Sequence, residues 1–383
     1  MAELDCYISV GQKKLRCGYT TGTCAAGAAR AAAELLLTGR CPDAVRVDTP
    51  AGIPVTAEVE SPASGPGWAS CAVRKDGGDD IDATHGALIF ARVERRESPG
   101  VAVDGGEGVG RVTRPGLDQP VGAAAINRVP REMIARELTA ALEGRDCPGL
   151  AAVISVPGGQ DIAKRTFNPS LGIVGGISIL GTSGIVRPMS EEALVESIRL
   201  ELSVRAAEGA GTVILTPGNY GRDFSRDVLG LELEDSVQCS NYIGQTIDLA
   251  VGLGFRRILL VGHAGKLVKA AAGAMNTHSR VADGRAETLA AYAALHGADR
   301  ETVAALLDSP TTDAAIPLLD RAGVREPVMA SISRALEARL RRRAGEGVEI
   351  EALFFSNVYG VLGRTSGAAG MIELLKAGKE EKL

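Results

Sequence analysis

Hydrophobic positions follow one pattern in the first half of the chain and another in the second. The first half has short apolar segments separated by glycine-rich turns, which predicts strands at residues 44–49, 53–60, 69–75, 86–94 and 151–156. A helix is predicted at 130–144, where Pro130 suits the first turn. Strands and helices mixed in this way predict an α+β domain.

The pattern changes near Pro188. Ser190 and the two glutamates after it predict the start of an amphipathic helix, and apolar strands then alternate with helices up to a strand at 349–357. This alternation is typical of a parallel sheet. We therefore expect two unequal domains, an α+β domain over residues 1–189 and an α/β domain over residues 190–383.

An alanine-rich helix is predicted between a cluster of threonines and Gly39. Thr20, Thr21 and Thr23 are residue types that cap helix N-termini, and Gly39 suits the left-handed position after a helix. A surface of such small side chains allows the close approach of another backbone or of a flat ligand. Two interpretations stay open, tight helix packing and an anion site at the helix N-terminus.

The composition argues against nucleic acid as a partner. Aromatic residues make up 3% of the chain and its net charge is −5, so neither stacking platforms nor a basic field is expected. No apolar run approaches the ~18 residues of a membrane helix, and the first residues lack the apolar region of a signal peptide. Seven scattered cysteines and four histidines form no zinc-binding spacing. We expect a cytoplasmic protein with reduced thiols, no membrane partner and no protein-bound metal.

Two segments resemble nucleotide-binding loops only superficially. The glycines of residues 103–116 do not open a helix, as a dinucleotide fingerprint requires. In the segment 260–269, Leu267 stands where a phosphate loop needs Ser or Thr. However, His263, Lys266 and Lys269 follow a core strand, and the segment 216–224 follows another, so both are expected at the carboxyl edge of the sheet, where open α/β sheets bind ligands.

A second group of polar residues lies in the first half. The segment 75–86 contains Asp76, Asp79, Asp80, Asp82 and His85, in a spacing that does not match an EF-hand. An acidic turn with local hydrogen bonds explains such a segment, and so does a site that handles a cation or a proton. A third polar segment, 276–285, includes His278 and Arg285.

These segments, in this order, resemble one family over essentially the whole chain. The sequences GYTTGTCAA, KDGGDD, GGEGVGRVT, AINRVPR, SVPGG, NYIG, VGHAGKLVK and NTHS, and above all the block from Thr166 to Met189, are similar to the cobalt-precorrin-5B C1-methyltransferases of anaerobic cobalamin synthesis. Two small departures are Ile81, where proline is expected, and Arg114, where lysine is usual. The resemblance implies methyl transfer from S-adenosylmethionine to C1 of a cobalt-bearing, ring-contracted tetrapyrrole, giving cobalt-precorrin-6A. It also implies a first domain like the second domain of ribosomal protein S5.

The resemblance and the residue types together assign expected roles. We expect the donor to be held by Pro217, Gly218, Asn219, Gly221, Gly262 and Gly265. The carboxylates of the macrocycle are expected on Thr20, Thr21, Thr23, Arg114, Lys164, Lys266, Lys269, His278 and Arg285. Catalytic roles are expected for His85, Asp80 and His263, because histidine titrates near neutrality and can act as a base.

Some alternatives stay open at this point. The cobalt belongs to the substrate. The sequence does not determine the oligomeric state, and a homo-oligomer is one of the alternatives. The rival functions are a nucleotide-dependent phosphotransferase and a corrinoid carrier that binds the macrocycle without a donor.

Overall fold

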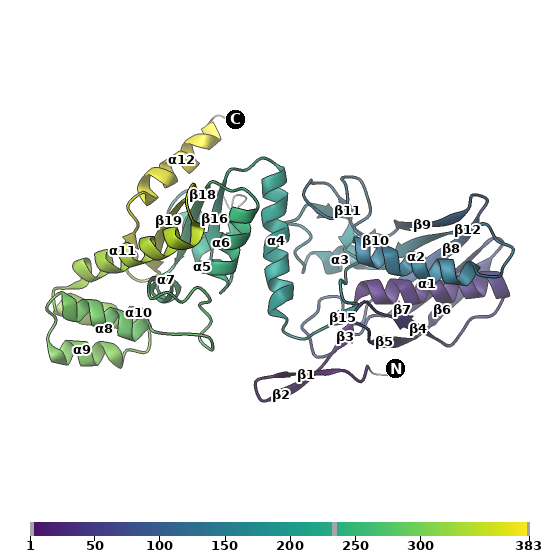
Figure 1. The fold of residues 1–383 in the computed structure, drawn as a ribbon, viewed down its shortest axis with the longest axis horizontal. Helices are drawn as coiled ribbons and strands as arrows, with labels where there is room; N and C mark the ends of the chain where they lie inside the picture. The colour runs from purple at the N-terminus through teal and green to yellow at the C-terminus, as the bar shows by residue number, and fades with distance from the viewer. Residues whose placement is uncertain (1–3, 232–235, 381–383) are drawn as a thin grey trace. The chain divides into compact units, whose positions relative to one another are not determined.

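The chain folds into two compact units, residues 1–191 and residues 192–383. The computed structural model describes residues 4–231 and 236–380, with side chains up to residue 377 (Figure 1). Strands and helices are mixed in both units, and parallel strands occur in both sheets. The mixed α/β class that was predicted is confirmed, whereas the likeness to ribosomal protein S5 stays a prediction.

The first unit is built on a five-stranded sheet in the order β6-β7-β8-β12-β9, in which only the β12–β9 pair is parallel. Its elements are β1 (Tyr7–Val10), β2 (Lys13–Arg16), β3 (Gly18–Tyr19), α1 (Thr21–Thr38), β4 (Ala44–Asp48), β5 (Pro54–Glu58), β6 (Glu60–Gly65), β7 (Trp68–Arg74), β8 (Leu88–Arg96), β9 (Gly100–Gly105), β10 (Gly108–Val109), β11 (Arg111–Val112), α2 (Arg128–Leu142), β12 (Gly149–Ser155), α3 (Gly159–Ala163), β13 (Ile173–Val174), β14 (Gly176–Ile177) and β15 (Ile185–Val186).

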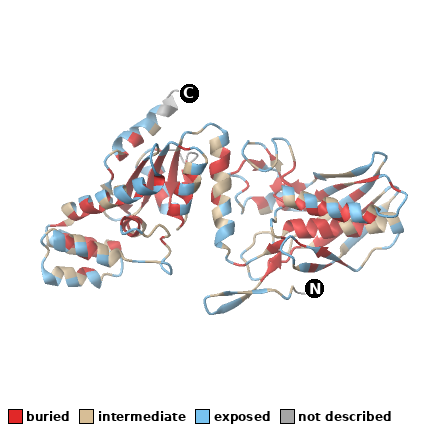
Figure 2. Ribbon diagram, in the orientation of Figure 1, coloured by how far each residue is buried: buried red, intermediate tan, exposed pale blue. Residues whose placement is uncertain are grey.

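Helix α1 lies beside α2 and is buried over most of its length (Figures 1 and 2). The small side chains allow this close packing. A Cβ placed at Gly27 would lie 3.3 Å from methyl carbons of Val45 and Val47 and 3.5 Å from one of Val73. Two β-strand segments, β4 and β7, therefore press directly against the alanine face. Tight packing was one of the two interpretations of this helix, and the structure confirms it.

The second unit is built on a sheet in the order β17-β16-β18-β19-β20, parallel except for β20. Its elements are α4 (Glu191–Ala207), β16 (Thr212–Thr216), α5 (Asn219–Asp227), β17 (Ser236–Gln238), α6 (Ile243–Gly252), β18 (Arg257–His263), α7 (Ala264–Ala271), α8 (Arg285–Leu295), α9 (Arg300–Leu307), α10 (Thr312–Arg321), α11 (Arg325–Ala344), β19 (Glu349–Ser356), β20 (Gly360–Arg364) and α12 (Ala368–Glu380).

The strands of the second sheet are buried on both faces. Leu215 and Leu260 belong to the larger apolar cluster, which includes residues of α6, α7 and α11, whereas Ile214, Leu259 and Val261 belong to a smaller one, with residues of α12. Helices α8, α9 and α10 contact one another and form a helical group next to α11 (Figure 1). The predicted parallel sheet is therefore present, with helices on both faces.

Candidate functional site

The loops after β16 and β18 meet at the carboxyl edge of the second sheet. A Cβ placed at Gly262 would lie 3.1 Å from Cδ of Pro217, and one placed at Gly218 would lie 3.8 Å from Nζ of Lys266. Because β16 and β18 are neighbouring parallel strands, their following loops lie side by side. The structure thus brings together Pro217, Gly218, Gly262 and Lys266, which were predicted from separate segments.

Two of the residues predicted for donor binding, Gly221 and Asn219, have contacts within the protein. A Cβ at Gly221 would lie 2.4 Å from the carbonyl oxygen of Val261, so this glycine lets α5 pack against β18. The Oδ1 atom of Asn219 accepts a hydrogen bond of 2.8 Å from Nε2 of Gln238. Gly221 is therefore a packing residue, and Asn219 ties its loop to β17.

His263 caps the helix that follows β18. Its Nδ1 accepts a hydrogen bond of 3.1 Å from the N–H of Gly265, and its Nε2 lies 3.8 Å from Oδ2 of Asp313. A neutral imidazole whose Nδ1 accepts carries its proton on Nε2. His263 therefore has no free nitrogen to take a proton unless the cap is lost, and its geometry fits a positioning role rather than that of a base.

Three buried polar atoms around these loops lack a hydrogen-bond partner among the described residues. They are Oγ1 of Thr216, Oγ1 of Thr312 and Oδ1 of Asp313. Thr216 and Thr312 are 0% and 1% exposed. A Cβ placed at Gly265 would lie 3.8 Å from Oγ1 of Thr312, which puts the start of α10 next to the start of α7. An unpaired buried polar group costs about 1–3 kcal/mol, so each of these atoms requires a polar partner, such as a water molecule or a ligand group.

Lys266 and Lys269 differ although both were predicted to bind substrate. Nζ of Lys266 donates to the carbonyl oxygen of Ser240 at 3.2 Å, and burial lowers the pKa of this lysine. Lys269 is only 4% exposed, and its Nζ donates to the carbonyl oxygens of Thr277 and Ala282. Lys269 is therefore enclosed by the protein and corrected to a structural residue.

Arg285 and His278 are held by local contacts. Arg285 forms two hydrogen bonds of 2.7 Å to the carboxylate of Asp283, which lower the pKa of that carboxyl to about 2. Nδ1 of His278 accepts from the N–H of Arg280 at 3.1 Å. Arg285 still lines a cavity of about 300 Å³ together with Thr312, so it stays a candidate for ligand binding.

The acidic side chains of the segment 75–86 are bound by other groups of the first unit. The guanidinium of Arg16 donates to both oxygens of Asp76, at 2.5 and 2.9 Å, and the buried ammonium of Lys75 donates to Asp82 at 2.7 Å. Asp80 accepts from the N–H of Met189 at 3.0 Å. Burial raises the pKa of Asp82, but the charge of Lys75 and the hydrogen bonds from Lys75 and Thr84 together outweigh burial, so the net pKa lies below its ordinary value. The acidic turn is therefore a built structural element.

His85 sits at the rim of a cavity of about 460 Å³ that Asp80 and Arg165 also line. Its side chain is 56% exposed, and its Nδ1 accepts a hydrogen bond of 3.0 Å from the N–H of Gly77. As with His263, the proton of the neutral ring then lies on Nε2. The geometry does not support the predicted role of His85 as a base, but its Nε2–H is free to donate to a ligand in the cavity.

The threonines at the start of α1 are bound by the protein's own backbone. Oγ1 of Thr21 donates to the carbonyl oxygen of Leu180 and accepts from its N–H, and Oγ1 of Thr23 donates to the carbonyl oxygen of Gly184. Thr20 caps the helix by accepting from the N–H of Thr23. These hydroxyls are occupied, so the predicted carboxylate cradle is replaced by a contact with the 180–184 loop.

The remaining predicted substrate residues of the first unit lie at its surface. Nη1 of Arg114 donates to the carbonyl oxygen of Ser170 at 3.1 Å, and Lys164 pairs with Asp161 at 2.7 Å. The Lys164–Asp161 pair is exposed and contributes little stability. Lys164 can therefore exchange this partner for a ligand carboxylate at low cost.

Comparison with known proteins decides the family. Residues 8–188 match the family model described as CbiD, and residues 276–366 match that of the CbiD C-terminal domain. A cobalt-precorrin-5B C(1)-methyltransferase of Thermoanaerobacter sp. is 53% identical over 84% of this chain and 87% of its own length. One of Ruminiclostridium cellulolyticum is 47% identical over 96% of this chain and 97% of its own. The chain belongs to the CbiD family.

A solved CbiD structure from Archaeoglobus fulgidus is also similar. It is 31% identical, covers 72% of this chain and 86% of its own, and has a TM-score of 0.39. The block from Thr166 to Met189, on which the resemblance most depended, lies inside the CbiD match except for its last residue. In the structure this block supplies Leu180 and Gly184, whose backbone closes the start of α1.

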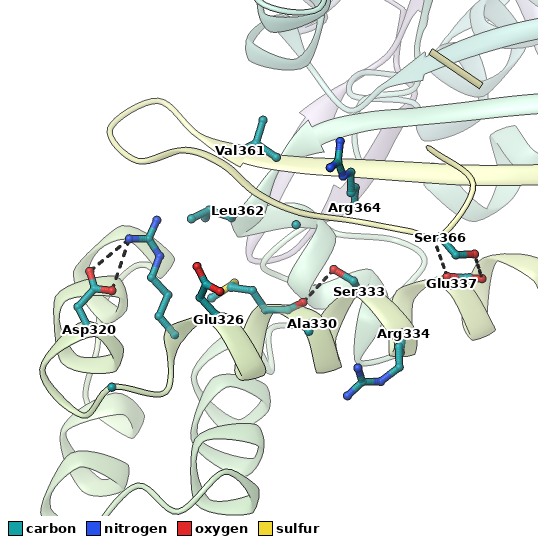
Figure 3. Close-up of a pocket in the computed structure, with 14 residues that line it drawn as sticks. Asp320, Glu326, Ala330, Ser333, Arg334, Glu337, Val361, Leu362, Arg364 and Ser366 are labelled. Carbon is teal, nitrogen blue, oxygen red and sulfur yellow. Dashed lines mark hydrogen bonds and ion pairs between the residues drawn. The ribbon is translucent and has the colours of Figure 1, made fainter. Parts of the chain in front are cut away.

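One cavity of this CbiD chain was not predicted. It measures about 730 Å³ and lies between α11 and the edge strand β20 (Figure 3). Its lining combines Arg334 and Arg364 with Glu326 and with apolar residues such as Leu362. The sequence signal for it is weak, because its residues come from a helix and a strand whose pairing depends on the tertiary fold.

Neither a metal-binding cluster nor a membrane-spanning helix is found among the residues that the structure describes. Among the residues that the structure describes, no three His, Cys, Asp or Glu side chains gather in a way that could hold a metal ion. Within residues 4–231 and 236–380, no helix combines the length and the apolar character that a membrane crossing needs.

Proposed function

We propose that this chain methylates C1 of cobalt-precorrin-5B, giving cobalt-precorrin-6A, with S-adenosylmethionine as the methyl donor. One observation carries the proposal. Curated relatives that are 43–53% identical over 81–98% of this chain bear the name cobalt-precorrin-5B C(1)-methyltransferase. The chain spans at least 82% of the length of each of these relatives, so their activity fits the protein as a whole.

The loops after β16 and β18 fit the methyl donor. Bound there, S-adenosylmethionine supplies a methyl group on a positively charged sulfur. Pro217 and Gly218 form one wall, Gly262 and Gly265 another, and the unpartnered hydroxyls of Thr216 and Thr312 offer polar contacts. The fit rests on these buried atoms, which need partners that the described residues do not provide.

The macrocycle carries acetate and propionate groups, which need cationic partners. In the second unit, Lys266 and Arg285 are suited to hold them, and in the first unit Arg114, Lys164 and the Nε2–H of His85 are suited. Each charged hydrogen bond of this kind contributes about 1.5–3 kcal/mol. We assign these cations to binding and orientation of the macrocycle.

Alignment is the main task of the protein in such a reaction. Holding two reacting atoms in the correct geometry can supply about 7–11 kcal/mol of the barrier. His263 fixes the start of α7 through Gly265, and His85 fixes the acidic turn through Gly77. Both histidines are therefore proposed as positioning residues.

The test is a reaction with purified components. The chain is incubated with cobalt-precorrin-5B and S-adenosylmethionine carrying a ¹³C-labelled methyl group, and the product is examined by mass spectrometry and ¹³C NMR. We expect one labelled methyl group, attached at C1, and release of S-adenosylhomocysteine. Binding of the macrocycle without methylation would favour a carrier, and hydrolysis of Mg-ATP would favour a phosphotransferase.

A further inference from the structure

Two thiols of the first unit lie next to each other in the apolar cluster around helix α1. Sγ of Cys41 and Sγ of Cys71 are 3.8 Å apart, and both cysteines are free. Cys41 belongs to the segment between α1 and β4, and Cys71 lies within β7. An S–S bond measures about 2.05 Å, so the two sulfurs need to approach each other by about 1.8 Å to be joined. The pair is therefore within reach of a disulfide.

The backbone is less constrained at one of the two cysteines. Cys71 is held in the middle of β7, where it is paired with Ala91 of β8. Cys41 lies outside the helices and strands, two residues after Gly39, which ends α1 in the left-handed conformation. No helix or strand ladder fixes the backbone of Cys41, so the movement that joins the sulfurs can come from its side.

Burial gives the two thiols different reactivity. Cys71 is 0% exposed, and burial, together with the neighbouring thiol of Cys41, raises its pKa to about 12. A buried thiol of this kind is inert toward solutes. Cys41 is half-buried, so a small oxidant can reach its sulfur. Cys71 can still react with Cys41, because two groups held this close have a high effective concentration that makes up for a small thiolate fraction.

We propose that Cys41 and Cys71 form a peroxide-sensitive dithiol, in which Cys41 is oxidised first and Cys71 then closes a disulfide on it. In the first step the sulfur of Cys41 attacks one oxygen of hydrogen peroxide, the O–O bond breaks, and a sulfenic acid and one water result. In the second step the sulfur of Cys71 attacks that sulfur, the S–O bond breaks, and a second water leaves. The two thiols lose two electrons and two protons, and the peroxide is reduced to two waters.

The disulfide protects Cys41 from permanent damage. A sulfenic acid that meets no second thiol is oxidised further to sulfinic acid, which thiols do not reverse, whereas a disulfide is reduced again by thiols. Neither Cys41 nor Cys71 is among the residues that line the cavities of about 730, 300 and 460 Å³ described above. The cross-link is therefore expected to be reversible and to leave these cavities as they are. The inference does not depend on the proposed function.

The test is peptide mapping of the full chain after oxidation. Trypsin cuts after Arg40, Arg46 and Arg74, so the peptides 41–46 and 47–74 each carry one cysteine. The reduced chain is treated with hydrogen peroxide, remaining thiols are blocked with iodoacetamide in urea, and the digest is analysed by mass spectrometry. We expect the two peptides to be joined, with a mass lower than their sum by two hydrogen atoms, and to separate after treatment with dithiothreitol.

Variants at each cysteine test the assigned order. Cys71→Ala should carry about fivefold or more sulfinic acid on Cys41 than the unchanged chain at the same peroxide concentration. Cys41→Ala should leave Cys71 a thiol. Cys239→Ala is the matched control, because Cys239 is also 0% exposed but belongs to the second unit, and the cross-link should form in it as before. If Cys71→Ala does not fold, the joined peptides of the unchanged chain and the state of Cys71 in Cys41→Ala decide.

Three results would overturn the inference. The first is that Cys41 and Cys71 stay thiols while another thiol pair of the first unit, Cys6 and Cys17, is oxidised. The second is an equal amount of sulfinic acid on Cys41 in the unchanged chain and in Cys71→Ala. The third is a cross-link that forms as fast in urea as in the folded chain, because the short distance between the two sulfurs would then not be its cause.

Discussion

The backbone N–H of Gly77 donates to Nδ1 of His85, so the histidine that lines the cavity of the first unit is also bound to its acidic turn. This hydrogen bond determines which nitrogen can act. Nε2 carries the proton and faces outward, and Nδ1 is occupied. The ring can therefore donate to a substrate group but is not placed to remove a proton.

The first prediction replaces His85 by asparagine. Oδ1 of asparagine can take the place of Nδ1 and keep the bond to Gly77, but the new side chain does not titrate. For His85→Asn we expect a methylation rate within about tenfold of the unchanged chain and an unaltered pH profile, since only one hydrogen bond to substrate is lost. Loss of the pH dependence together with a much larger loss of rate would restore His85 as a base. His85→Ala, which also loses the hydrogen bond from the N–H of Gly77, serves as the comparison.

The second prediction concerns the buried pair of Lys75 and Asp82. Asp82→Asn leaves the ammonium of Lys75, which is 1% exposed, without its counter-charge. We expect the free energy of unfolding to fall by about 3 kcal/mol, at the lower end for broken buried pairs because Asp82 is partly exposed. Urea denaturation measures the change. The exposed pair Lys164–Asp161 is the control, and Asp161→Asn should leave the midpoint of urea denaturation nearly unchanged.

The third prediction is a loss of stability in acid, which follows from the ion pairs of Asp76 and Asp82. Asp76 is buried and Asp82 is half-buried, which raises the pKa of each, but their hydrogen bonds and the charges of Arg16 and Lys75 together outweigh burial, so the folded-state pKa of each lies below its ordinary value of 3.8. A carboxyl with a lowered folded pKa stabilises the fold above its unfolded pKa, and this contribution is lost as the pH falls through the folded pKa. Thermal unfolding followed from pH 7 downward should therefore show a Tm that declines below about pH 4. A shallower decline in Asp82→Asn is expected, and an equal decline would exclude this residue as a source.

Much of the fold could be predicted because local signals agreed with the tertiary structure. The predicted segments 44–49, 53–60, 69–75, 86–94 and 151–156 overlap the strands β4, β5, β7, β8 and β12, with bounds that differ by at most two residues. Strand β6 was missed because ESPASG has proline and small polar residues, and on its sheet edge four of its six residues are exposed and the other two half-buried. A strand that depends on its partner rather than on its own apolar positions leaves little trace in the sequence.

The candidate site could be predicted only in part, for a similar reason. The segment Pro217–Gly218 follows β16, and the segment Gly262–Lys266 spans the end of β18 and the start of α7, and the rule for parallel sheets places both at one edge. Thr312 and Asp313 were missed because they read as the capped start of a helix, and their relation to Gly265 exists only in the folded chain. Lys269 was assigned to the substrate because its burial by Thr277 and Ala282 is equally a tertiary property.

The fourth prediction tests whether Gly221 is needed for the packing of α5 against β18. A Cβ at Gly221 meets the backbone oxygen of Val261 at 2.4 Å, and a backbone atom cannot move aside as a side chain can. For Gly221→Ala we expect a loss of roughly 1–3 kcal/mol of unfolding free energy. Gly252→Ala, at the end of α6, meets no atom within 4 Å and should be neutral or stabilising. Equal stability of the two variants would contradict the tight contact between α5 and β18.

The last prediction contrasts two lysines on helix α7. Lys269→Met removes the donor of two buried carbonyl oxygens, so the free energy of unfolding should fall by about 1–3 kcal/mol. Lys266→Met should leave Tm nearly unchanged, because it removes a charge that burial already penalises, but weaken macrocycle binding by about 1.5–3 kcal/mol. Absorbance titration with cobalt-precorrin-5B measures this affinity.

The pH dependence of that affinity identifies the lysine that acts. Burial lowers the pKa of Lys266, so its charge is lost at a lower pH than the ordinary lysine value of 10.5. Affinity for an anionic macrocycle should therefore decrease as the pH rises toward that value, in the unchanged chain but not in Lys266→Met. If both proteins lose affinity in parallel, a different cation holds the substrate. If Lys269→Met alone loses affinity at an unchanged Tm, the structural assignment of Lys269 is wrong and the original prediction for this residue is restored.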